Sequence, residues 1–180
     1  ARGYAVIPVP ARKKIPVLKG WTDLRLSESD LPAHFNGTGN IGVLLGEPSG
    51  WLVDVDLDCE EAVALAPKFL PPTDAMSGRP GKPASHWWYI CEGIKTRKHQ
   101  DPVSKKMIVE LRSTGAQTVV GPSIHPSGEP YDPLDGEPAV VDAGELAAAV
   151  AALAEAVTEA RHGRKEHARS QPGALGTPSF

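Results

Sequence analysis

Short apolar runs bounded by turn-forming residues dominate the first two thirds of the chain. They cover residues 4–9, 41–45, 51–57, 86–91, 107–111 and 117–120. Each run is rich in β-branched or aromatic residues and is flanked by Gly, Pro, Ser or Asn, as is typical of β-strands. The pattern therefore predicts a core built mainly from short strands.

Two further segments have helical patterns. Residues 60–69 are expected to form a short helix with Asp58 as its N-cap. Residues 143–161 are expected to form a longer helix, because apolar side chains recur at spacings of four, three and four: Leu146, Val150, Leu153 and Val157. Several strands with few helices between them predict an α+β fold with a mixed or mostly antiparallel sheet.

The length of 180 residues fits one domain. We expect residues 1–142 to form the core and residues 143–161 to form a helix that packs on the core or extends from it. Residues 162–180 lack periodicity, so we expect a disordered linker there. The chain begins with Ala1 directly before an apolar run, and we therefore expect it to be a piece of a longer polypeptide.

Composition and charge restrict the class of protein. The formal net charge of −3 gives no overall attraction to nucleic acid, so binding to nucleic acid would need a local basic surface. Cys59 and Cys91 are too few for a structural zinc site and indicate reduced thiols in a cytoplasmic protein. No apolar run approaches the roughly 20 residues that a membrane-spanning helix needs.

Acidic residues interrupt the third apolar run. Because side chains alternate across a strand, Asp54 and Asp56 are expected on one face of the run and Val53, Val55 and Leu57 on the other. Two carboxylates so close together repel each other unless a cation lies between them, and oxygen ligands suit Mg²⁺ or Mn²⁺. The alternative is a solvated strand face or a charged edge strand.

A third acid lies in the run at residues 107–112. Glu110 is out of phase with Val109 and Leu111, and Arg112 shares its face. If this strand is the neighbour of the first acidic strand, three carboxylates and one guanidinium meet, which is the composition of a two-metal phosphoryl-transfer site. An ordinary exposed ion pair on one strand is the alternative.

Residues 77–89 combine a glycine-rich turn with basic residues. Gly78 and Gly81 allow a tight turn, while Arg79 and Lys82 supply the positive charge that a triphosphate needs. His86 opens the next strand and could donate a hydrogen bond to a phosphate oxygen. The alternative is a surface hairpin with a structural histidine. The aromatic residues that follow could stack on bases or pack in the core: Trp87, Trp88 and Tyr89.

A second polar turn covers residues 121–128. Ser123 and His125 could reach a phosphate or a sugar, although a loop braced by Pro and Gly is the simpler interpretation. Together with the first turn, this gives the candidate nucleotide-binding residues: Ser77, Arg79, Lys82, Ser85, His86, Arg112, Ser123 and His125.

In this order, the segments resemble the bifunctional primase-polymerase domains of plasmid and phage replication proteins, within the archaeo-eukaryotic primase superfamily. The resemblance covers roughly residues 3–131. It is carried by Gly3-Tyr-Ala-Val-Ile-Pro-Val-Pro10, Lys14-Ile-Pro16, Gly20-Trp21, Asn40-Ile-Gly-Val-Leu-Leu-Gly46, Asp54-Val-Asp56, Ser77-Gly-Arg79 with His86, Glu110-Leu-Arg112, Pro122-Ser-Ile-His-Pro-Ser-Gly128 and Tyr131.

The resemblance implies template-directed nucleotidyl transfer, with Mg²⁺ or Mn²⁺ held by Asp54, Asp56 and Glu110. It implies that His86 binds the nucleotide, with Ser77 and Arg79 in the preceding loop. The implied partners are single-stranded DNA template and primer, nucleoside triphosphates, and a helicase domain in the same full-length polypeptide. The implied fold packs a small N-terminal α/β unit against an RNA-recognition-like sheet, with the active site in the cleft between them.

The chain departs from the family pattern in three places. Pro80 and residues 82–85 lengthen the loop before His86, the ligands of a zinc-binding insertion found in some relatives are absent, and so is the helix that normally precedes the opening Gly-Tyr. Two other functions remain open. A metal-dependent nuclease could use the same acids. A non-catalytic module that binds single-stranded nucleic acid could use the aromatic residues.

Overall fold

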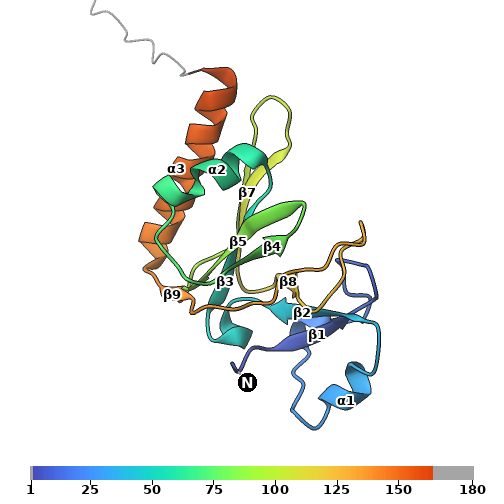
Figure 1. Cartoon of the computed structure of the whole chain (residues 1–180). Coiled ribbons are helices and arrows are strands. Elements are labelled where there is room, and N and C mark those ends of the chain that lie inside the picture. Colours follow the sequence, from blue (N-terminus) through green and yellow to red (C-terminus); the bar gives the residue numbers. More distant parts are fainter. Residues whose placement is uncertain (1, 164–180) are drawn as a thin grey trace, which may run out of the picture.

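Two β-sheets and a pair of packed helices form the fold (Figure 1). The structure is a computed structural model and describes residues 2–163. The smaller sheet has three antiparallel strands in the order β1-β2-β8, which are Val6–Val9, Asn40–Leu44 and Gln117–Val120. It lies at the end of the molecule opposite the two packed helices, next to the short helix α1 (Leu31–His34) (Figure 1).

The larger sheet has the acidic strand at its centre. Its strands follow the order β4-β5-β3-β7-β6, and every neighbouring pair is antiparallel. A short sixth strand, β9, pairs with β5 in parallel. The strands are β3 (Leu52–Leu57), β4 (Met76–Arg79), β5 (Lys82–Ile90), β6 (Arg97–Gln100), β7 (Met107–Arg112) and β9 (Ala139–Val140).

Two helices, α2 (Glu60–Phe69) and α3 (Ala143–His162), cover one face of the larger sheet (Figure 1). Asp142 caps α3, because its side chain accepts hydrogen bonds from two N–H groups of the first turn. Apolar residues from β3 and from the predicted stripe of α3 are buried together: Val53, Val55, Leu57, Leu146, Val150, Leu153 and Val157. Short helical turns occur at Trp21–Asp23 (η1), Leu31–His34 (α1) and Glu47–Ser49 (η2).

The opposite face of the larger sheet packs in part against the smaller sheet. Leu52 and Trp88 of the larger sheet form a second core with Val43, Leu45 and Val120. All six residues of β3 are therefore buried, on both faces of the sheet. Asp54 and Asp56 lie on this second face, between the two sheets.

The α+β class and the six predicted strands and two predicted helices are confirmed, with small shifts at their ends. The pattern did not predict β4, β6 or β9. The predicted N-cap at Asp58 is wrong, because α2 begins after Cys59. The predicted linker at residues 162–180 lies almost entirely outside the described residues. Within residues 2–163, no helix is long and apolar enough to cross a membrane.

Candidate active site

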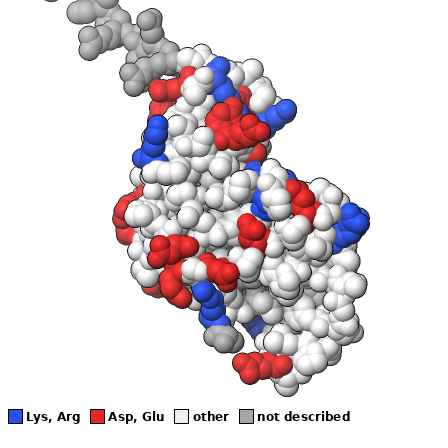
Figure 2. All heavy atoms as spheres, viewed as in Figure 1, with Lys and Arg blue, Asp and Glu red and all other residues white. Residues whose placement is uncertain are grey.

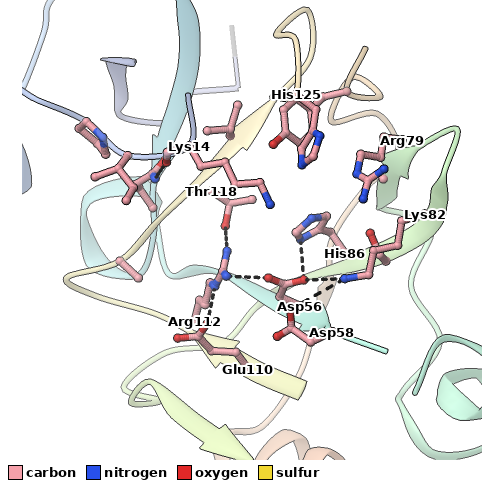
Figure 3. Close-up of a pocket in the computed structure, with 18 of the residues that line it drawn as sticks. Lys14, Asp56, Asp58, Arg79, Lys82, His86, Glu110, Arg112, Thr118 and His125 are labelled. Atoms are coloured by element: carbon pink, nitrogen blue, oxygen red, sulfur yellow. Dashed lines mark hydrogen bonds and ion pairs between the residues drawn. The ribbon is translucent and has the colours of Figure 1, made fainter. Parts of the chain in front are cut away.

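A pocket of about 390 Å³ lies between the two sheets (Figure 3). Strands β3, β4, β5 and β7 provide one wall. The segment after β1, from Lys14 to Trp21, and strand β8 provide another, and the turn that carries His125 closes one side. The expected cleft between a small N-terminal unit and a larger sheet is therefore present in the structure.

Strand register brings the acids and their neighbours together. Asp56 of β3 lies opposite Glu110 of β7 on one side and opposite His86 of β5 on the other. Asp54 lies opposite Arg112. The expected adjacency of the two acidic strands is therefore confirmed, with the basic β4–β5 hairpin joined to the same sheet.

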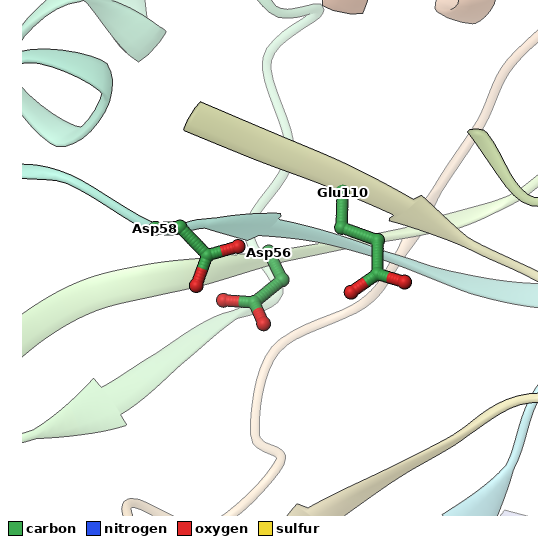
Figure 4. Close-up of side chains that lie close together, drawn as sticks. All are labelled: Asp56, Asp58 and Glu110. Carbon is green, nitrogen blue, oxygen red and sulfur yellow. The ribbon is translucent and has the colours of Figure 1, made fainter. Parts of the chain in front are cut away.

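Asp56, Asp58 and Glu110 form a group that we call the acid triad (Figure 4). One carboxylate oxygen from each residue lies within 4.8 Å of the others, so the group could bind a metal ion. Asp58 continues the extended chain past β3, because its N–H donates to the carbonyl of Ile108 at 2.8 Å. Partial burial raises the pKa of Asp58, and the charges of Asp56 and Glu110 raise it further, as expected where carboxylates converge.

Asp54 lies outside this group. Its side chain is fully buried, its Oδ2 accepts a hydrogen bond from Thr118 Oγ1 at 2.6 Å, and His86 Nδ1 lies 2.9 Å from the same oxygen. It does not line the pocket. The sequence led us to expect Asp54 among the metal ligands. In the structure it is Asp58, and not Asp54, whose carboxylate lies beside those of Asp56 and Glu110 and lines the pocket.

His86 links the buried acid to the pocket. Burial alone would lower its pKa, but Asp54 and Asp56 outweigh that effect and raise it. Burial would likewise raise the pKa of Asp54, but the charge and hydrogen bond of His86, with help from Arg112 and Thr118, lower it. Both shifts favour the charged pair, an imidazolium and a carboxylate, over the neutral one. His86 contacts Asp54 through Nδ1, and its ring lines the pocket.

Within the described residues, three Lys and Arg side chains, Arg112, Lys82 and Lys98, neutralise part of the acid triad. Lys98 Nζ lies 3.4 Å from Oε1 of Glu110. Arg112 contacts Asp56 at 2.6 Å and Glu110 at 3.0 Å, which fixes both carboxylates. Lys82 Nζ lies 3.9 Å from Oδ1 of both Asp56 and Asp58. The negative charge of Asp58 is therefore less well neutralised than the charges of Asp56 and Glu110. Across the whole face shown in Figure 2, Lys and Arg side chains are scattered among acidic ones rather than gathered in one basic patch.

The glycine-rich turn with basic residues, which begins at Ser77, is a tight hairpin rather than an open loop, because β4 ends at Arg79 and β5 begins at Lys82. A Cβ at Gly78 would lie 2.4 Å from the carbonyl oxygen of Lys82, so the hairpin needs glycine there. Glu129 pairs with Arg79 and accepts a hydrogen bond from the Gly81 N–H at 2.5 Å. Arg79 lines the pocket, but it is already paired.

Several candidate residues have structural contacts. Ser77 Oγ accepts a hydrogen bond from Trp88 Nε1 at 2.8 Å, and Ser123 Oγ accepts one from the Ile41 N–H at 2.8 Å. Both serines are buried and outside the pocket lining, whereas Ser85 is buried but lines the pocket. Of the two interpretations of the aromatic residues in β5, packing in the core is confirmed, because all three are at most 7% exposed: Trp87, Trp88 and Tyr89.

His125 lines the pocket from the second polar turn. Its Nδ1 accepts a hydrogen bond from the Ser127 N–H at 3.1 Å, and its ring contacts Tyr131 edge-on at 5.6 Å between centroids. Burial lowers the pKa of His125, and the nearby charges of Lys14 and Arg79 lower it further. A neutral imidazole held in this way has Nε2–H free to donate.

Several residues that line the pocket were not among the predicted site residues: Lys14, Asp58, Gln117, Thr118 and Tyr131. The alternation that selected Asp54 and Asp56 also includes Asp58, so that signal was available. Lys14 and Tyr131 lie in segments that carry the family resemblance, although no role was predicted for either residue. For Gln117 and Thr118, no pattern indicates the pocket, because they belong to the smaller sheet.

Residues 1–158 match the model of the bifunctional DNA primase/polymerase N-terminal domain family. The chain belongs to this family. A comparison with individually curated proteins finds no match. Membership of the primase/polymerase family indicates nucleotidyl transfer in DNA replication, with DNA and nucleotides as substrates and a divalent metal requirement. The match extends through most of α3, in agreement with the buried stripe that joins this helix to the sheet.

Proposed function

We propose that this primase/polymerase domain catalyses template-directed, divalent-metal-dependent joining of nucleotides in the replication of a plasmid or phage. The supporting observation is the acid triad, which faces a pocket whose other walls carry Lys, Arg and His side chains. Carboxylates for a metal and cations for phosphates are the two requirements of phosphoryl transfer.

The acid triad would hold the metal. Its donors are all oxygens, which suits Mg²⁺ or Mn²⁺. A divalent cation bound there would supply Lewis acidity, lowering the pKa of the primer 3′-hydroxyl and neutralising charge on the pyrophosphate that leaves. Arg112 orients Asp56 and Glu110, because it contacts both carboxylates.

The protonated His86 is the central phosphate donor in this proposal. Asp54, itself held by Thr118, keeps the imidazolium charged and fixes the ring through Nδ1. Nε2–H is then available to a phosphate oxygen in the pocket. Asp54 is therefore a positioning residue, whereas Lys82 and Arg79 reach the phosphates from the hairpin once phosphate competes with their acidic partners.

Primer extension tests the proposal. Unaltered protein with Mg²⁺ or Mn²⁺ should extend a labelled primer on a template, and Glu110→Gln should lose extension while remaining folded. Incubation of labelled DNA with metal but without nucleotides separates synthesis from a nuclease. Degradation of the DNA, with no extension when nucleotides are added, would overturn the proposal.

We also propose that the domain acts in the cytoplasm on a single-stranded template and its primer, and that the full-length polypeptide carries a helicase. The resemblance of the motifs to plasmid and phage replication proteins supports this arrangement. Stimulation of primer synthesis by a helicase region from the same gene would test it, and no stimulation would count against it.

A further inference from the structure

The cations that line the pocket differ in their partners. His86, Arg79, Lys82 and Arg112 each have a carboxylate oxygen no farther than 3.9 Å away. Lys14 also lines the pocket, but among residues 2–163 its ammonium group has no ion pair and no hydrogen bond. Lys14 thus has a charge without a partner inside an otherwise paired cluster.

The backbone around Lys14 is fixed despite its irregular conformation. Asn40 Nδ2 donates to the carbonyl oxygen of Lys13 at 2.9 Å, and Gln117 Nε2 donates to that of Lys14 at 2.7 Å. Asn40 is 1% exposed and also bonds both the N–H and the carbonyl of Ile124. The buried side-chain amide of Asn40 therefore fixes the segment around Lys14 relative to the turn that carries His125.

The surroundings of Lys14 favour an anion. Its side chain points into the pocket, on the side of His125 and His86 (Figure 3). Partial burial lowers the pKa of Lys14, and Lys82, Arg79 and Arg112 lower it further, although Asp56 opposes them. Lys14 is exposed at the mouth of the pocket, and an anionic ligand placed among these groups would relieve the repulsion between the cations.

We propose that Lys14 binds the triphosphate of the incoming nucleotide, from the wall opposite the basic hairpin. This inference rests on the proposed function and adds a residue to it. The triphosphate would lie between the ammonium of Lys14 on one side and the hairpin cations on the other. A DNA backbone phosphate offers the same chemistry, but a pocket of about 390 Å³ matches a small ligand better than a strand.

Lys14→Met tests this assignment, because it keeps the length of the side chain and removes the charge. Lys13→Met is the matched control, since Lys13 is adjacent and exposed and does not line the pocket. The binding of dATP and dAMP with Ca²⁺ is measured by calorimetry, and the binding of a primer–template by fluorescence anisotropy. Thermal unfolding shows whether each variant is folded.

We expect Lys14→Met to weaken dATP binding about tenfold, the loss of one charge-assisted hydrogen bond, and dAMP binding much less. Lys13→Met should leave both affinities unchanged, and primer–template affinity should be retained in both variants. A structural role for Lys14 would weaken dATP and dAMP equally and would overturn the inference.

Two other outcomes would also overturn it. If the unaltered protein binds dATP and Lys14→Met binds it equally well, the inference fails alone and the proposed function stands. If only primer–template affinity falls, Lys14 contacts the DNA backbone instead. Failure of the unaltered protein to bind dATP at all would remove the proposed function and this inference together.

Discussion

Asp54 and Asp58 have the same phase in the strand alternation but different surroundings. The same substitution should therefore affect the stability of the fold at one position and metal binding at the other. Asp54→Asn and Asp58→Asn each replace a carboxylate with an amide of nearly equal shape. Asp58 belongs to the acid triad and is exposed to the pocket, whereas Asp54 is fully buried beneath it. We expect the first variant to lose stability and the second to lose metal binding.

For Asp58→Asn, the metal loses one of three carboxylate ligands. Loss of an outer-sphere partner typically costs 10–100-fold in metal affinity, so loss of a direct ligand should cost at least about 100-fold. Stability should change by less than about 1 kcal/mol, because the residue is exposed and its pKa is raised by its neighbours. A raised pKa in an acid means that its charge destabilises the fold at neutral pH, so any change should be in the stabilising direction.

For Asp54→Asn, the fold loses the charge that balances a buried imidazolium. The carboxylate accepts a hydrogen bond from Thr118 at 2.6 Å and lies 2.9 Å from His86 Nδ1. Breaking a buried ion pair by removing one partner costs about 3–5 kcal/mol. Metal affinity should fall by less than about tenfold, because Asp54 is linked to the triad indirectly, through Arg112 at 3.9 Å.

Two measurements separate these expectations. Urea unfolding gives the free energy of unfolding, and titration with Mn²⁺, followed by calorimetry, gives metal affinity in the folded protein. Glu110→Gln serves as a second triad variant and should behave like Asp58→Asn. If Asp54→Asn abolishes Mn²⁺ binding while Asp58→Asn retains it, Asp54 is the ligand and the acid triad is wrongly assigned.

Three more predictions follow from contacts outside this pair. Lys82→Met should raise Mn²⁺ affinity about fivefold without nucleotide, because the ammonium competes for two triad carboxylates, and calorimetry would detect this. Asn40→Ala should lower the free energy of unfolding in urea by about 2–4 kcal/mol, since it removes three hydrogen bonds from a buried site. Arg161 bonds both oxygens of Glu61 and lowers the pKa of Glu61 to about 2, from an ordinary 4.5. The ion pair should stabilise the fold by at most about 1 kcal/mol, because it is exposed. This stabilisation is present above pH 4.5 and is lost as the pH falls toward 2. Glu61→Gln should therefore flatten the plot of unfolding free energy against pH in that range, measured by urea unfolding.

Local periodicity was enough to predict the main elements of the fold. The strand alternation at residues 51–57 and the helical stripe of α3 each identify the side that is buried, and both faces pack together in the structure. The same alternation placed Asp56 and Glu110 on one face, and strand pairing then made them neighbours. These predictions succeeded because they depend on residues close together in sequence.

The remaining features of the site depend on distant contacts. Whether Asp54 or Asp58 faces the pocket depends on where the smaller sheet covers β3, and the alternation of β3 is the same for both. Arg79 is paired with Glu129, fifty positions away in the chain, and the Lys14 segment is held by Asn40 and Gln117. A single sequence carries no local signal for such contacts.

The distribution of compensating charge explains why the acids of β3 can be tolerated and where a cation would bind. Asp54 is compensated by His86 at 2.9 Å, and Asp56 by Arg112 at 2.6 Å, so neither buried carboxylate lacks a nearby basic side chain. Among residues 2–163, the one basic side chain within 4.0 Å of the Asp58 carboxylate is Lys82, at 3.9 Å. Of the three acids, Asp58 at the pocket end therefore has the weakest compensation. A divalent cation should bind most favourably where the carboxylates are least neutralised, which is at Asp58. The acid triad lies at that end of the strand.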